Sequence, residues 1–147
     1  MYFGLYLMAL LAGAGLIVQL GMNARLGAAF GNPIPAVFVN FAVGLVGLLA
    51  YLFVTRVPVP AREQLAGAPA WAWLGGLIGA FYVVAATIVG PRVGAVMLLS
   101  LTLTGQMLAS LVIDHYGLLG FAAHPVTPLR LLGVAFLFAG VGLLFAR

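Results

Sequence analysis

Long apolar runs, separated by short polar or proline-containing segments, occupy almost the whole chain. Each run has about the length of a bilayer crossing, which takes roughly 17–25 helical residues. The runs cover residues 2–22, 35–55, 71–90, 93–113 and 129–146. Continuous apolar runs without strict alternation are typical of membrane helices and not of membrane-barrel strands. The pattern predicts an all-α integral membrane protein with five transmembrane helices in a single membrane domain, residues 1–147.

Proline and glycine mark the ends of the predicted spans. Pro35 suits the first turn of the second helix, and residues 25–30 can continue the first helix beyond its apolar run. The segment 56–70 contains three prolines and predicts a loop. Gly90-Pro91-Arg92 predicts a very short turn, so the third and fourth spans are expected to pack antiparallel. A second loop is expected at residues 114–128.

Composition supports the membrane interpretation. Hydrophobic residues make up 65% of the chain and charged residues 5%, whereas soluble domains are about 45–50% apolar and about 25% charged. The first run is too long for the apolar region of a signal peptide, so it is expected to be a retained helix. The net charge of +4 comes from isolated arginines and forms no basic cluster suited to nucleic acid.

The residue inventory argues against catalysis. The chain has no cysteine, its two serines are Ser100 and Ser110, and both histidines fall in the second loop. A hydrolytic nucleophile needs a neighbouring base, and a zinc site needs several Cys, His or carboxylate ligands. We therefore expect no enzyme activity, no catalytic residues, no metal site and no cofactor.

The arginines divide equally between the two sides of the membrane. With five spans, three lie on the amino-terminal side and three on the other: Arg56, Arg62 and Arg130 against Arg25, Arg92 and Arg147. Orientation normally follows an excess of Lys and Arg in cytoplasmic loops, and here there is no excess. Either another feature decides the orientation or the chain inserts both ways, and we predict insertion in both orientations. Because many transporters pair two inverted repeats, the balance also predicts an antiparallel homodimer in which this chain is one repeat.

Polar side chains within the predicted spans are the candidate functional residues, since polar groups in a membrane helix usually serve transport or helix association. Steps of four residues place several of them on shared helix faces. The candidate pathway residues are Gln19, Asn23, Asn40, Tyr82, Thr102, Gln106 and Ser110. The alternatives are that the amides only join helices and that the hydroxyls bond to their own backbone.

Three charges at helix ends are candidates for the mouths of a pathway. Arg25, Arg92 and Asp114 could act there, with Arg25 and Asp114 as a possible gate pair. Asp114 at a helix end is also typical of a boundary charge or of the partner of an arginine. No carboxylate lies in the middle of a span, so proton coupling is not indicated.

Four segments carry a resemblance to a known family. They are Gln19-Leu-Gly-Met-Asn23-Ala-Arg25-Leu, Asn40-Phe-Ala-Val-Gly44, Trp71-Ala-Trp73-Leu-Gly-Gly-Leu-Ile-Gly79-Ala-Phe-Tyr82, and Gly105-Gln106 followed by Asp114-His-Tyr-Gly117. Over essentially its whole length the chain resembles the YdcZ-type branch of the drug/metabolite transporter superfamily. The resemblance implies a five-span bacterial inner-membrane protein, a half-sized transporter that pairs with itself or a sister chain. Related four-span exporters use a glutamate in the first helix, where this chain has Gln19, which argues against drug/proton antiport.

Together these features predict a multi-pass protein of the bacterial inner membrane that transports a small organic solute by alternating access as an antiparallel dimer. Its expected partners are the lipid bilayer, a second copy or a sister chain, and the solute; no nucleic acid is expected. Two alternatives remain open at this point: a non-transporting helical subunit or scaffold, and a lipid scramblase.

Overall fold

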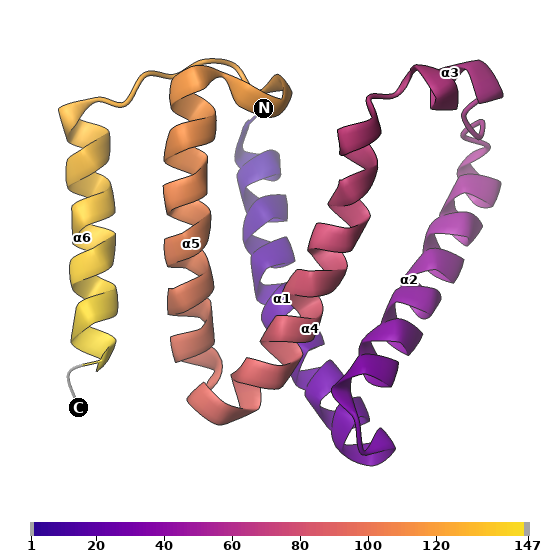
Figure 1. The fold of residues 1–147 in the computed structure, drawn as a ribbon, viewed down its shortest axis with the longest axis horizontal. Helices are drawn as coiled ribbons and strands as arrows, with labels where there is room; N and C mark the ends of the chain where they lie inside the picture. Colours follow the sequence, from indigo (N-terminus) through magenta and orange to yellow (C-terminus); the bar gives the residue numbers. More distant parts are fainter. Residues whose placement is uncertain (1, 146–147) are drawn as a thin grey trace. The chain divides into compact units, whose positions relative to one another are not determined.

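The computed structural model describes residues 2–145, and the part so described is helical with connecting loops (Figure 1). Five helices within residues 2–145 are long and apolar enough to cross a membrane. They are α1 (Tyr2–Phe30), α2 (Pro33–Thr55), α4 (Leu74–Val93, preceded by the 3-10 turn η1, Ala70–Trp73), α5 (Ala95–Tyr116) and α6 (Pro128–Phe145). The five-span all-α prediction is confirmed. The proposed end of the last span at Ala146, and Arg147 beyond it, lie outside the described residues.

The connection between α1 and α2 is shorter than the sequence suggested. α1 continues to Phe30, as residues 25–30 allowed, and Gly31 makes the turn with φ +70°. The Asn32 side chain then accepts a hydrogen bond from the Ile34 N–H at 2.9 Å. This cap satisfies one of the free N–H groups at the helix start, which lets α2 begin at Pro33.

The turn between the third and fourth spans lies at Gly94 and not at Gly90-Pro91-Arg92. α4 continues through Pro91 to Val93, and Gly94 interrupts the helices with φ +87°. Proline has no backbone N–H, so one intrahelical hydrogen bond is missing at Pro91, in the last turn of α4. The Arg92 guanidinium donates to the Ile88 carbonyl oxygen at 2.6 Å and so binds one of the carbonyls of this last turn.

Both predicted loops contain short helical segments. The first holds α3 (Arg62–Gly67), whose start is capped by a hydrogen bond from the Ala61 N–H to the Gln64 side chain at 2.9 Å. The second holds the 3-10 turn η2 (Leu118–Gly120). The sequence predicted both loops but not these short helical segments.

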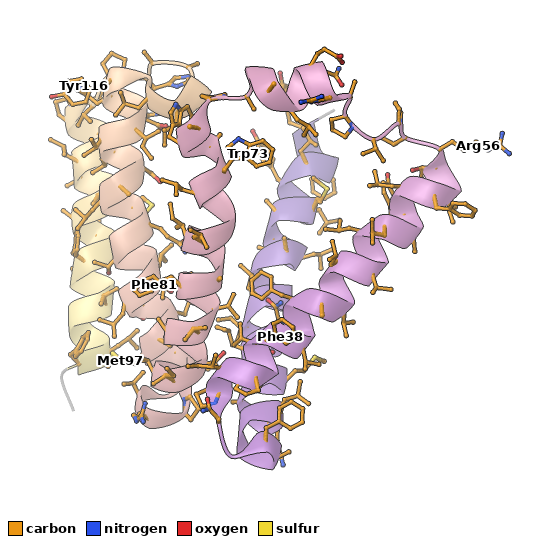
Figure 2. All side chains as sticks on the ribbon, turned by 45° about the vertical axis from the view of Figure 1, so that its right-hand side comes forward. Phe38, Arg56, Trp73, Phe81, Met97 and Tyr116 are labelled. Carbon is orange, nitrogen blue, oxygen red and sulfur yellow. The ribbon has the colours of Figure 1, made fainter. Side chains whose placement is uncertain are left out.

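The chain divides into two compact units, Met1–Arg92 and Val93–Arg147, which are described separately. In the first, α1 and α2 meet at their shared turn and diverge toward their other ends (Figures 1 and 2). The buried residues of this unit gather toward the turn end of α1 and α2 and in the second half of α4. We call them the vertex cluster: Leu20, Asn23, Ala36, Val37, Val83, Ala86 and Thr87. The remaining length of each helix is largely exposed to the surroundings.

A close backbone approach holds the turn end of α1 and α2. A Cβ built at Gly27 would lie 3.2 Å from the Pro33 Cα. In the second unit, α5 and α6 lie side by side as an antiparallel pair, and Val134 is buried there (Figure 1). The antiparallel dimer and its inverted-repeat arrangement remain predictions.

Substituting Gly27→Ala should destabilise the protein. The added Cβ meets backbone atoms that cannot rotate away, so we expect a loss of about 1–3 kcal/mol. Gly21→Ala is the matched control, because a Cβ there has no neighbour within 4 Å. The control should stay within about 1 kcal/mol of the parent protein. Unfolding in mixed micelles followed by circular dichroism measures both, and equal stability of the two variants would contradict the close approach.

Candidate functional site

The most unusual polar residue of the structure is Asn23 on α1. Its side chain is 0% exposed. Neither its Oδ1 nor its Nδ2 atom has a hydrogen-bond partner among the described residues. Buried amides are nearly always paired, and leaving one unpaired costs about 1–3 kcal/mol. The unpaired amide therefore makes Asn23 the first candidate for a functional residue.

The geometry of the α1–α2 turn explains where Asn23 lies. With Gly27 against Pro33, the antiparallel course of the two helices brings Asn23 to about the height of Val37, since both helices rise by about 1.5 Å per residue. Ala36 and Val37 are 0% and 3% exposed, and they offer no polar side-chain atom. Asn23 thus lies where two helices come together on small apolar side chains.

The buried hydroxyl group of the vertex cluster, that of Thr87, already has a hydrogen-bond partner. Thr87 on α4 donates to the Val83 carbonyl oxygen one turn earlier, at 2.7 Å. A threonine can satisfy itself within its own helix in this way, whereas an asparagine on a continuous helix cannot satisfy both ends of its amide so easily. Thr87 was not among the candidates chosen from the sequence.

The other polar candidates of the first unit are less buried than Asn23. Gln19 and Asn40 are half-buried, and the height of Gln19 on α1 corresponds to that of Asn40 and Phe41 on α2 by the same antiparallel register. Tyr82 on α4 is also half-buried. The first unit therefore carries amides on two of its helices and a phenol on the third.

A groove of about 310 Å³ runs along this end of the first unit. It is lined by α1, the start of α2 and the last turns of α4: Ala24, Gly27, Ala28, Pro33, Thr87, Ile88, Pro91 and Arg92. Arg92 and Arg25 are both exposed. The groove is mostly apolar, with one cation, Arg92, among its lining residues.

The second unit carries the polar seam of α5, which consists of Thr102, Gln106, Ser110 and Asp114. Thr102 bonds to the Leu99 carbonyl oxygen at 3.1 Å, as the self-bonding alternative foresaw. Gln106 and Ser110 are exposed and Asp114 is half-buried. The seam and the amides of the first unit belong to separately described units, so the suggested gate pair of Arg25 and Asp114 remains a prediction.

The partner of Asp114 within the second unit is Arg130 of α6. An Arg130 guanidinium nitrogen (Nη1) lies 3.3 Å from Asp114 Oδ2 and 3.1 Å from the His124 carbonyl oxygen. The sequence analysis expected an arginine partner as one alternative but did not choose it. Arg130 was the available signal, because it lies two residues into the last span on the same membrane side as Asp114.

The loop that follows α5 is held against the helix ends. The His124 N–H donates to the Asp114 carbonyl oxygen at 2.7 Å. The Val126 N–H donates to His115 Nδ1 at 3.2 Å, which leaves the proton of a neutral ring on Nε2. These hydrogen bonds therefore hold the loop in place beside the Asp114–Arg130 pair.

Comparison with known proteins places these features in a family. The family model described as "Putative inner membrane exporter, YdcZ" matches residues 4–143. The chain is 28% identical to the "Inner membrane protein YdcZ" of Escherichia coli (strain K12) over 121 residues, which cover 82% of this chain and 77% of that protein. No solved structure matches the chain.

Replacing Asn23 by leucine should stabilise the folded protein. Leucine has the same branching as asparagine and removes the unpaired amide, so we expect a gain of about 1–3 kcal/mol. Asn23→Gln keeps the amide and should bring no gain. Unfolding in mixed micelles compares the variants. Lower stability of Asn23→Leu than of the parent protein would show that the amide has a structural partner.

Proposed function

Since the chain belongs to the YdcZ family of multi-pass inner-membrane proteins, we propose that it transports a small organic solute across the bacterial inner membrane by alternating access. The working unit in this proposal is an antiparallel homodimer, or a pair with a sister chain. The chain itself is not an enzyme in this proposal and needs no metal or cofactor. Membership of a family described as an exporter supports transport as the general activity.

The observation that carries the proposal is the unpaired amide of Asn23. An amide offers two donors and an acceptor oxygen, and none of them bonds to a described residue in this conformation. Opening the vertex cluster would let water or a polar solute reach the amide and recover the lost hydrogen bonds. The described conformation then corresponds to a state in which this binding group is closed off.

The remaining candidates complete the proposed pathway. Gln19, Asn40 and Tyr82 would line it with Asn23 in the first unit, and Thr102, Gln106 and Ser110 in the second. Arg25, Arg92 and Asp114 would act at its mouths. The Asp114–Arg130 pair supports a boundary location for that mouth, since a charge pair at a helix end need not cross the apolar part of the bilayer.

The divergence of α1 and α2 supports alternation. The two helices are packed together at one end and separate toward the other (Figure 2). A transporter needs a site that closes on one side of the membrane while it is accessible from the other. One chain supplies one such closed end, and an inverted second copy would supply the other.

Unused small-residue faces support a second copy. Among the described residues of the first unit, no atom of another element lies within 4 Å of a Cβ built on Gly75 or Gly79 of α4. Small residues spaced by four let membrane helices approach closely. Together with the equal division of arginines, these free faces favour association of inverted copies.

Replacing Asn23 by leucine should also slow solute transport. Proteoliposomes that contain the parent protein are loaded with a panel of neutral, cationic and anionic radiolabelled solutes. We expect the parent protein to release at least one of these solutes. Asn23→Leu should slow that loss about tenfold, the equivalent of one lost hydrogen bond to solute of about 1.4 kcal/mol. Met22→Leu, on an exposed position of α1, is the matched control and should transport normally. Equal flux in all three proteins would contradict the role of Asn23.

The topology prediction uses the absence of native cysteine. Single cysteines at Ala66 in α3 and at Ala29 near the end of α1 mark the two sides of the membrane. If the chain inserts both ways, a membrane-impermeant maleimide should label about half of each variant in intact cells, and the rest after permeabilisation. Complete labelling of one variant and none of the other would establish a single orientation and remove the antiparallel homodimer.

The alternative of a non-transporting subunit or scaffold is tested at Gln106. If the seam of α5 only joins helices, Gln106→Leu should abolish assembly in cross-linking experiments and leave solute flux at the level of the parent protein. If the seam lines a pathway, flux should fall while the cross-linked dimer persists.

A further inference from the structure

The α5–α6 groove is a second, separate depression, in the second unit. It has a volume of about 330 Å³. Its lining residues are Met107, Ser110, Leu111, Asp114, Arg130, Gly133 and Val134. One end carries the Asp114–Arg130 pair, and the rest is largely apolar. The groove is therefore charged at one end and apolar along the rest, as an amphiphilic molecule is.

The ion pair leaves binding capacity free at the charged end. Arg130 and Asp114 keep 41% and 34% of their side chains exposed. Among described residues, Arg130 uses only Nη1 of its guanidinium, and Asp114 only Oδ2 of its carboxylate. An arginine fork suits a phosphate, and a carboxylate oxygen accepts from an ammonium group.

The charges present favour a zwitterionic ligand. A cation and an anion lie within 3.3 Å of each other, so a purely anionic ligand bound to Arg130 would also meet the Asp114 carboxylate. A ligand with a phosphate and a nearby primary ammonium group satisfies both. A quaternary ammonium group would have no N–H to donate to Asp114.

The location of the groove favours a lipid over a soluble molecule. The groove follows the membrane spans α5 and α6, and its charged end lies where α5 ends. Tyr116, at that same end of α5, is 68% exposed, and tyrosines are enriched at the membrane–water interface (Figure 2). A lipid headgroup lies at this depth, and its acyl chain would extend along Leu111 and Met107.

We propose that the α5–α6 groove binds a zwitterionic phospholipid with a primary ammonium group, phosphatidylethanolamine in chemical class. Its phosphate binds Arg130, its ammonium group binds Asp114, and the first part of one acyl chain lies along the apolar walls. The loop brace from His124 to the Asp114 backbone holds the charged end in place and so lowers the entropy cost of binding. The site shares Ser110 and Asp114 with the proposed transport pathway, but lipid binding is measured at equilibrium and without solute flux, so the two proposals can fail separately.

Lipid competition tests the proposal on the full chain in nanodiscs. The probe is a photoactivatable phosphatidylethanolamine, and cross-linking is measured against added phosphatidylethanolamine, phosphatidylcholine or phosphatidylglycerol. We expect phosphatidylethanolamine to compete about tenfold better than the other two, one charge-assisted hydrogen bond being enough for that factor. Asp114→Asn should shift the preference toward phosphatidylglycerol, because Arg130 then acts without its counter-charge. Arg62→Gln in α3 is the control and should leave the preference unchanged.

A second variant separates loss of the site from loss of the fold. Gly133 has open space at its Cβ position, so Gly133→Leu adds an apolar side chain to the groove and leaves both charged residues in the sequence. It should lower cross-linking about tenfold, whereas Gly142→Leu, on the opposite face of α6, should not. Unchanged lipid preference in Asp114→Asn together with unchanged cross-linking in Gly133→Leu, with native circular dichroism of both variants, would overturn the proposal. Equal competition by soluble glycerophosphoethanolamine would also overturn it, since the acyl chain would then contribute nothing.

Discussion

The close approach of α1 and α2 at Gly27 and Pro33 is the contact on which the first unit depends. Apolar helices gain little from burying apolar surface against each other in a bilayer, because lipid tails are equally apolar. Close packing of small residues has to replace that driving force. A glycine opposite a proline backbone provides it here, and the register that results places the Asn23 amide where no polar group of residues 2–145 forms a hydrogen bond with it. Helix spacing and the candidate binding group therefore have one origin.

The spans were predictable because their physics is local. A bilayer requires about 20 apolar residues per crossing, and each of the five runs meets that length independently of its neighbours. The turn at Gly94 was not predictable from Gly90-Pro91-Arg92 alone, since proline ends a helix in one context and is tolerated in its last turn in another. Pro91 belongs to the second case, and the deciding feature is the positive φ angle that only Gly94 readily adopts.

The candidate site was predictable in its residue types but not in its pairing. Steps of four on one helix bring Gln19 and Asn23 to the same face, and Thr102 could be expected to bond to its own helix. Which of two amides would be fully buried depends on the α1–α2 register, which no single helix determines. Arg130 and Asp114 are 16 residues apart, and a loop whose hydrogen bonds involve His115 and His124 brings them together.

The single-residue link at Gly94 has a consequence for motion. Val93 ends one membrane helix and Ala95 begins the next. Because only two peptide units join these residues, their Cα atoms can lie at most about 7 Å apart. The two helix ends therefore cannot part in any conformation, whatever the rest of the chain does. Any change in the direction between α4 and α5 therefore has to be made by the backbone dihedral angles at and beside Gly94, and glycine has the widest range of φ and ψ.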